Sequence, residues 1–161
     1  MKNAAVVSII KKLTEKNEPP CKKTLQKIVF LIEEKSLDLG FDYGIHFYGP
    51  YSSDLDFSIY ELSNEGILNI DYTRTKHIIS VMDDVVYPEF QNNIIDEVIE
   101  EFGKESPSQL ELTATALYVY TKNGKNKKKI MEGVRKIKGS KYTKKNIEET
   151  IQRLVETGYV H

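Results

Sequence analysis

Apolar residues recur at helical spacing through the first forty positions of the chain. A predicted helix over residues 2–16 has one apolar face, formed by Val6, Ile9, Ile10 and Leu13. Proline cannot continue a helix, so the Pro19-Pro20 pair ends this segment. A second predicted helix covers residues 22–39 and ends at Gly40, a residue suited to the left-handed conformation that follows many helices.

The next segment combines β-type and helical patterns. Ile45–Tyr48 predicts a short strand, Gly49-Pro50 a turn, and the residues from about Ser53 a third helix. Leu68–Tyr72 alternates apolar with polar residues, and the alternation resumes at Ile79 and Val81, which predicts a β-hairpin. This order of elements is winged-helix-like, although the short strand follows the second helix and not the first.

The second half of the chain is predicted to be helical. Phe90, Ile94, Val98 and Phe102 recur every four residues and predict an amphipathic helix with an acidic outer face. Ser106-Pro107 is a typical helix start, with serine as N-cap and proline in the first turn. The following segment, 110–120, is nearly uncharged, so we expect it to form the buried centre around which the other helices pack.

Two short amphipathic segments end the sequence. Their apolar positions lie within 130–137 and 147–155, and Thr143 is the expected N-cap of the second helix. We therefore predict an α+β fold that is mainly α, in a single domain over 1–161. It comprises a winged-helix-like N-terminal part (1–82) with a short strand and a β-hairpin, central helices (83–121), and a basic helix-turn-helix-like tail (122–161).

Composition and charge limit the class of protein. Of 161 residues, 40% are hydrophobic and 29% are charged, which is typical of a globular chain. The net charge is only −1, but nine acidic residues lie within 83–111 and eleven lysines or arginines within 122–145. A single cysteine, Cys21, excludes an internal disulfide, and no segment is apolar over the length of a membrane span. We expect a cytoplasmic protein that does not contact membranes.

The motifs of the common enzyme classes are missing from the sequence. The three histidines, His46, His77 and His161, share no metal-binding spacing, and adjacent acidic pairs do not face one another as an acid and base would. Nucleophile-elbow and phosphate-loop patterns are absent too. We therefore expect no catalytic set, metal or cofactor, and the alternative is an enzyme whose site has an unfamiliar pattern.

The basic tail is a candidate nucleic-acid surface. Its lysines could neutralise phosphates in a salt-dependent manner, or they could form an ordinary solvated face. The candidate residues are Lys125, Lys127, Lys128, Lys129, Lys141, Lys144 and Lys145. The third predicted helix, which would read DNA in a winged helix, carries four acidic residues instead, so any DNA contact is assigned to the tail.

The string His46–Ser52 is the most distinctive in the chain. Its aromatic residues flank a predicted helix start, where unpaired backbone N–H groups could hold an acidic or carbonyl group. The string is either a packed corner or an aromatic recognition pocket. The candidate partner-binding residues here are His46, Tyr48, Gly49, Pro50 and Tyr51.

Two strings together resemble a known family. Leu25-Gln26-Lys27, followed about twenty residues later by Tyr48-Gly49-Pro50 and a helix, resembles the Panacea (SocA-like) antitoxin domain and its YwgA-like relatives. Tyr51-Ser52 after the proline is closer to the YwgA-like branch, since many antitoxin members have an aliphatic residue at the position of Tyr51.

The resemblance implies a mostly helical cytoplasmic protein that neutralises a toxin by direct binding. It adds Leu25, Gln26 and Lys27 to the partner-binding candidates. The leading hypothesis is thus a non-enzymatic protein-binding module, antitoxin-like or an adaptor, whose partner could be a toxin. The alternative is a winged-helix DNA-binding regulator that uses the lysine-rich tail.

Overall fold

The computed structural model describes residues 1–124 and 126–161, and these form seven α-helices and two antiparallel sheets of two strands each. In chain order the elements are α1 (Lys2–Lys16), α2 (Lys22–Glu34), β1 (Gly44–His46), β2 (Gly49–Tyr51), α3 (Ser53–Asn64), β3 (Leu68–Tyr72), β4 (His77–Val81), α4 (Asn93–Phe102), α5 (Pro107–Asn123), α6 (Lys127–Lys138) and α7 (Lys144–Glu156). The predicted α+β class, mainly α, is confirmed.

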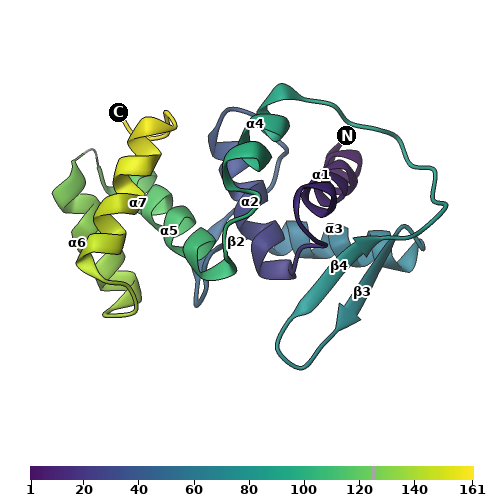
Figure 1. The fold of residues 1–161 in the computed structure, drawn as a ribbon, viewed down its shortest axis with the longest axis horizontal. Helices are drawn as coiled ribbons and strands as arrows, with labels where there is room; N and C mark the ends of the chain where they lie inside the picture. The colour runs from purple at the N-terminus through teal and green to yellow at the C-terminus, as the bar shows by residue number, and fades with distance from the viewer. Residues whose placement is uncertain (125) are drawn as a thin grey trace.

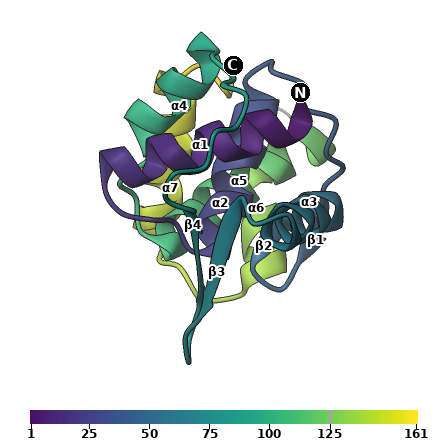
Figure 2. The same cartoon turned by 90° about the vertical axis from the view of Figure 1, so that its right-hand side faces the viewer.

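Helix α2 lies in the middle of the molecule (Figure 1). Helices α5, α6 and α7 pack together on one side of it, and α1, α3 and the β3–β4 hairpin lie on the other. The hairpin projects away from the helices in both views (Figures 1 and 2). Because α2 contacts α4, α5 and β2, it joins the N-terminal elements to the C-terminal helices.

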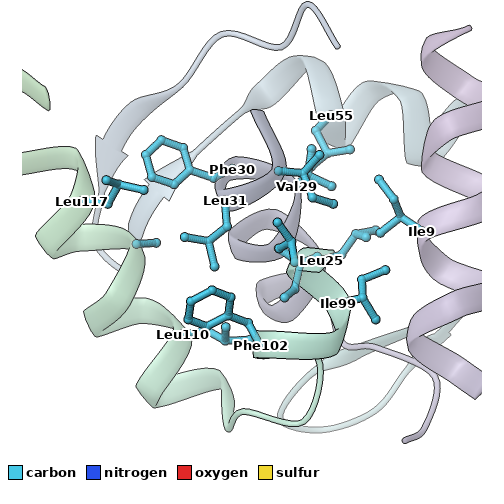
Figure 3. Packing of buried hydrophobic residues seen from close by; sticks show 14 of the residues in the cluster. Ile9, Leu25, Val29, Phe30, Leu31, Leu55, Ile99, Phe102, Leu110 and Leu117 are labelled. Carbon is cyan, nitrogen blue, oxygen red and sulfur yellow. The ribbon is translucent and has the colours of Figure 1, made fainter. Parts of the chain in front are cut away.

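The core surrounds α2 (Figure 3). Leu25, Val29 and Leu31 of this helix are fully buried, and Figure 3 shows them among side chains from four other helices. Those side chains are Ile9 of α1, Leu55 of α3, Ile99 and Phe102 of α4, and Leu110 and Leu117 of α5. Residues 110–117 are all buried, so α5 is a central helix as predicted, and it shares that position with α2.

Side-chain caps fix the starts of several helices. Ser106 Oγ accepts a hydrogen bond from the Gln109 N–H at 3.1 Å, and Thr143 caps α7 in the same way, as predicted. The predicted start of α3 at about Ser53 is confirmed, and its cap is Ser52, whose Oγ accepts from the Leu55 N–H at 3.2 Å. Ser52 has an extended backbone suited to an N-cap, whereas Ser53 is already helical.

Two helices are shorter than their apolar patterns predicted. Helix α2 ends at Glu34 and not at residue 39, because Ser36 adopts a left-handed conformation and the chain beyond it folds Leu39 into the core as a loop. Helix α4 begins at Asn93, where Asn92 provides the cap, so Phe90 lies outside the helix. The Phe90 N–H instead donates to Ser8 Oγ at 3.0 Å.

The predicted short strand is a small hairpin. Strands β1 and β2 pair with His46 opposite Gly49, so Gly49-Pro50 belongs to the second strand and the turn consists of Phe47 and Tyr48. An isolated bridge also pairs Cys21 with Ile78 of β4. This bridge involves the residue immediately before α2, and β1–β2 lies between α2 and α3.

Gly133 permits the close approach of α5 and α6, and Gly133→Ala is expected to destabilise the protein by about 1–3 kcal/mol. A Cβ at this position would lie 2.4 Å from Val119 Cγ1. This overlap outweighs the gain of about 1 kcal/mol that alanine brings to a helix. Chemical denaturation should show the loss, and Val119→Ala in the same chain should recover part of it. An increase in stability from the single substitution would contradict this packing.

Candidate functional site

The two distinctive strings of the sequence meet in space. Gln26 Nε2 donates to the Ser52 carbonyl at 2.8 Å, and Gln26 Oε1 accepts from the Ser52 N–H at 2.9 Å. Next to it, Lys27 Nζ donates to the Pro50 carbonyl at 2.8 Å. Two side chains of α2 thus satisfy backbone groups of Pro50 in β2 and of Ser52 just after it, and they fix the hairpin to the core.

Burial divides the predicted partner-binding residues into two groups. Leu25, Gln26, Lys27, Gly49 and Pro50 are buried, so in the folded protein they support the site and do not offer a surface to a partner protein. The remaining candidates are more accessible: His46 and Tyr48 are exposed and Tyr51 is half-buried.

Gly49 allows β2 to lie directly against α5, and Gly49→Ala is expected to cost about 2–3 kcal/mol of stability. Its φ is +94°, and a Cβ would lie 2.8 Å from Thr115 Oγ1. Gly66→Ala is the matched control, because Gly66 has φ +78° with open space around it and tests backbone strain alone. Thermal unfolding of both variants separates the two effects, and equal losses would rule out the steric contribution.

A buried carboxylate lies behind the hairpin, at a position that is not among the residues predicted to be functional. Glu111 of α5 is fully buried, with Lys23 Nζ at 2.6 Å from Oε1. Its Oε2 lies 2.6 Å from Lys141 Nζ and 3.1 Å from Lys138 Nζ, and accepts a hydrogen bond from the Tyr142 hydroxyl at 2.8 Å. The available signal was that Glu111 is the only acidic residue in an otherwise nearly uncharged helix.

The surroundings of Glu111 keep it ionised. Burial by itself would raise the pKa of this carboxyl group, but hydrogen bonds from Lys141, Lys23, Tyr142 and Lys138 outweigh burial and lower the pKa to about 2. One carboxylate therefore forms ion pairs with three neighbouring ammonium groups. We call Glu111, Lys23, Lys138 and Lys141 the Glu111 cluster, and it joins α2, α5, α6 and the loop that follows α6.

Lys27 adds a further amine beside this cluster. It is 1% exposed, and burial is the main cause that lowers its pKa to about 7. The charge of Glu111 raises the pKa of Lys27, while those of Lys23 and Lys138 lower it.

The turn between β1 and β2 presents an exposed apolar surface. Phe47 is 84% exposed, Tyr48 54% and Ile45 39%, and the rings of Phe47 and Tyr48 meet edge to face at 4.9 Å. We call these three residues the hairpin surface. Lys138 Nζ donates to the Phe47 carbonyl at 2.7 Å, so the Glu111 cluster also holds the turn.

The lysines of the predicted basic tail differ in their partners. Those that the structure describes are all exposed, namely Lys127, Lys128, Lys129, Lys141, Lys144 and Lys145. Lys141 is bound to the buried Glu111 although its side chain is 41% exposed, and Lys125 lies outside the described residues. Part of the exposed set borders a groove of about 710 Å³ between α6 and α7, which acidic residues also line, and Lys144 lies 3.9 Å from Glu148.

Within residues 1–124 and 126–161, no group of three or more His, Cys, Asp or Glu side chains is placed to hold a metal ion. His46 lies in β1 with its ring centroid 4.7 Å from that of Tyr51, and His77 contacts Tyr72 in the β3–β4 hairpin. Across the same described ranges, no helix has the length and apolarity needed to cross a membrane.

The chain is similar to a known protein over nearly its full length. The chain is 28% identical over 162 residues to the uncharacterised protein YwgA of Bacillus subtilis strain 168, and the alignment covers 92% of this chain and 93% of that protein. No family model matches the chain. The similarity extends over nearly the full length of both chains, and it assigns no activity.

Proposed function

We propose that this chain is a non-enzymatic protein-binding module of the cytoplasm, antitoxin-like or an adaptor, that contacts its partner through the hairpin surface. The observation that supports this most directly is the exposure of Phe47 and Tyr48 at the tip of an anchored turn. Exposed aromatic residues on a fixed support are typical of the few positions that provide most of the energy of a protein interface.

The anchoring of the hairpin favours binding. Two strands of three residues each would not hold a defined structure alone in water. Here Lys138 fixes the backbone of the turn itself, and Gln26 and Lys27 fix the backbone that follows it. A surface that is already ordered loses less conformational entropy when a partner binds, so more of the contact energy appears as affinity.

The charges near the hairpin indicate which partner surface fits. Lys23 Nζ lies 4.7 Å and Lys141 Nζ 5.8 Å from the centre of the Tyr48 ring. The Glu111 cluster has three ammonium groups for one carboxylate, so the surroundings of Tyr48 carry a net positive charge. We infer a partner that places acidic residues around an apolar contact, because complementary charge favours specific association.

Phe47→Ser tests this proposal in a quantitative pull-down from extracts of the native host. We expect a specific protein to be recovered with the unmodified chain and to decrease at least about tenfold with the variant, as for a central interface residue. Phe57→Ser is the control, because Phe57 is 64% exposed but lies on α3. Equal recovery of every protein by all three chains would overturn the proposal.

The antitoxin-like form of the proposal rests on the resemblance of the two strings to the Panacea domain. It has a separate test in the genes that neighbour this one. A neighbouring toxin should arrest growth when expressed alone, and co-expression of this chain should restore growth, whereas the Phe47→Ser variant should not. If co-expression of this chain does not relieve the growth arrest, the antitoxin-like form is excluded and only the adaptor form of the proposal remains.

A DNA-binding role for the tail is the second candidate. Three exposed lysines, Lys127, Lys128 and Lys129, are adjacent in the first turn of α6. If they contact phosphates, glutamate at all three positions should abolish a DNA mobility shift, and each lost contact should reduce the slope of log affinity against log salt by about 0.9. A shift that does not change in the triple variant would exclude this role.

A further inference from the structure

A second feature lies beside the hairpin, on the side of the β3–β4 loop. A cavity of about 490 Å³ is bordered by the start of α2, by Tyr48 and Tyr51, by residues 75–77 and by Pro107. This volume is within the usual range for small-molecule sites. Four lysines line it, namely Lys22, Lys23, Lys27 and Lys76.

The lining of this cavity has an excess of positive charge. None of its lining residues is acidic. Lys22 has a carboxylate of its own in Asp56, at 2.6 Å, and Lys23 shares Glu111 with two other lysines. Within residues 1–124 and 126–161, neither Lys27 nor Lys76 has a carboxylate within 4.0 Å.

Lys27 is the residue that most needs an anion. Its side chain is 1% exposed, and its single hydrogen-bond partner in the described chain is the neutral Pro50 carbonyl at 2.8 Å. An ammonium group can donate three hydrogen bonds, and a buried charge without a counter-charge is costly. An anion in the cavity would provide both the charge and the missing acceptors.

We propose that this cavity is a binding site for a small phosphorylated molecule, with its phosphate oxygens close to Lys27, Lys23 and Lys76 and its remaining part beside Tyr48 and Tyr51. A phosphate dianion matches the two lysines that lack a carboxylate, and lysine is a common phosphate ligand. The cavity is larger than a phosphate ion, so the geometry favours an organic phosphate. This proposal does not depend on the protein-binding role.

Proton uptake should accompany binding. The charged or titratable groups that act on Lys27 are Lys23 and Cys21 from its own segment, Glu111 from α5 and Lys138 from α6. Since Lys27 has a pKa of about 7 in the free protein, it is mostly neutral at about pH 8. A bound anion favours its charged form, so the protein should take up a proton from the buffer on binding.

Isothermal titration calorimetry of the full chain tests the site. The probes are inorganic phosphate, a pentose 5-phosphate and the same pentose without phosphate, at constant ionic strength and about pH 8 in two buffers of different ionisation enthalpy. We expect the pentose phosphate to bind most tightly, with proton uptake, and the free pentose not to bind. Equal affinity for inorganic phosphate and the pentose phosphate would mean that the site recognises only the phosphate group, and it would overturn the organic part of the proposal.

Substitutions of lining lysines test whether the ligand binds in this cavity. We expect Lys27→Met to lower the affinity at least about tenfold and Lys76→Gln severalfold, since each removes a charge-assisted contact. Lys129→Gln is the control, because Lys129 is exposed on α6, and this variant should bind the pentose phosphate as the unmodified chain does. Lys76 is exposed, so its variant remains decisive if Lys27→Met fails to fold.

The result that overturns the proposal is binding of similar strength by all four chains, or no heat with either phosphate. Phe47→Ser separates the two proposals, because Phe47 is not a lining residue of the cavity. This variant should keep the phosphate affinity while losing the protein partner.

Discussion

Glu111→Gln is expected to lower the free energy of unfolding by about 3–5 kcal/mol near neutral pH, the usual cost of removing one member of a buried ion pair. Glutamine has nearly the size of glutamate, so the change removes charge and little volume. It leaves Lys23, Lys138 and Lys141 without the carboxylate that now lies within 3.1 Å of each of them. Urea denaturation measures the loss, and Glu132→Gln, exposed on α6, is the matched control.

The acid dependence of stability gives a second measurement on the same variant. The pKa of Glu111 is about 2 in the folded chain, below the value of about 4.3 for an unperturbed glutamate. A lowered pKa means that the stabilisation is present above the unfolded value and is lost as the pH falls toward the folded value. Between about pH 5 and pH 2 the unmodified protein should therefore lose more stability than the variant. Parallel curves would contradict the role of Glu111.

Lys27→Met is expected to change the alkaline side of the stability curve. Lys27 has a pKa of about 7 when folded, against about 10.4 when unfolded, so between these values the unfolded chain binds more protons. The free energy of unfolding then increases with pH, by a total on the order of 4 kcal/mol for this difference in pKa. The variant should lack this increase, because methionine fills a similar volume and does not titrate.

Guanidinium denaturation at a series of pH values, in the absence of phosphate, measures the difference between the two chains. Lys128→Met provides the control, since Lys128 is exposed and its substitution should leave the slope unchanged. Other groups that titrate in this range act on all three chains and cancel in the comparison. An increase of the same size in Lys27→Met would assign the alkaline stabilisation to a different group.

Most helices could be predicted from the sequence because their signals are local. Ser106 and Thr143 cap helices whose starts depend on only three or four neighbouring residues. The nearly uncharged segment 110–120 could be placed in the core by composition alone, since such a helix has no strongly polar face. The end of α2 could not be predicted, because the buried loop residue Leu39 continues the apolar period by chance.

The candidate site was only partly predictable. The strings around Gln26 and Gly49 stood out, but the contact of Gln26 with Ser52 spans 26 residues and has no periodic signature. The Glu111 cluster depends on Lys23 and Lys138, which are far from it in sequence. The sequence also could not indicate that Lys27 and Gly49, two of the predicted partner-binding residues, are buried.

The chain between β4 and α4 connects two parts of the fold by a long route over the surface (Figure 1). Val86 in this connection is 97% exposed and lies outside any helix or strand. Such a segment is the preferred target of a protease. Helix α4 packs against α1 and α2, which precede the connection, so a chain cut at Val86 would remain folded as a two-piece complex, and its halves would separate only in denaturant.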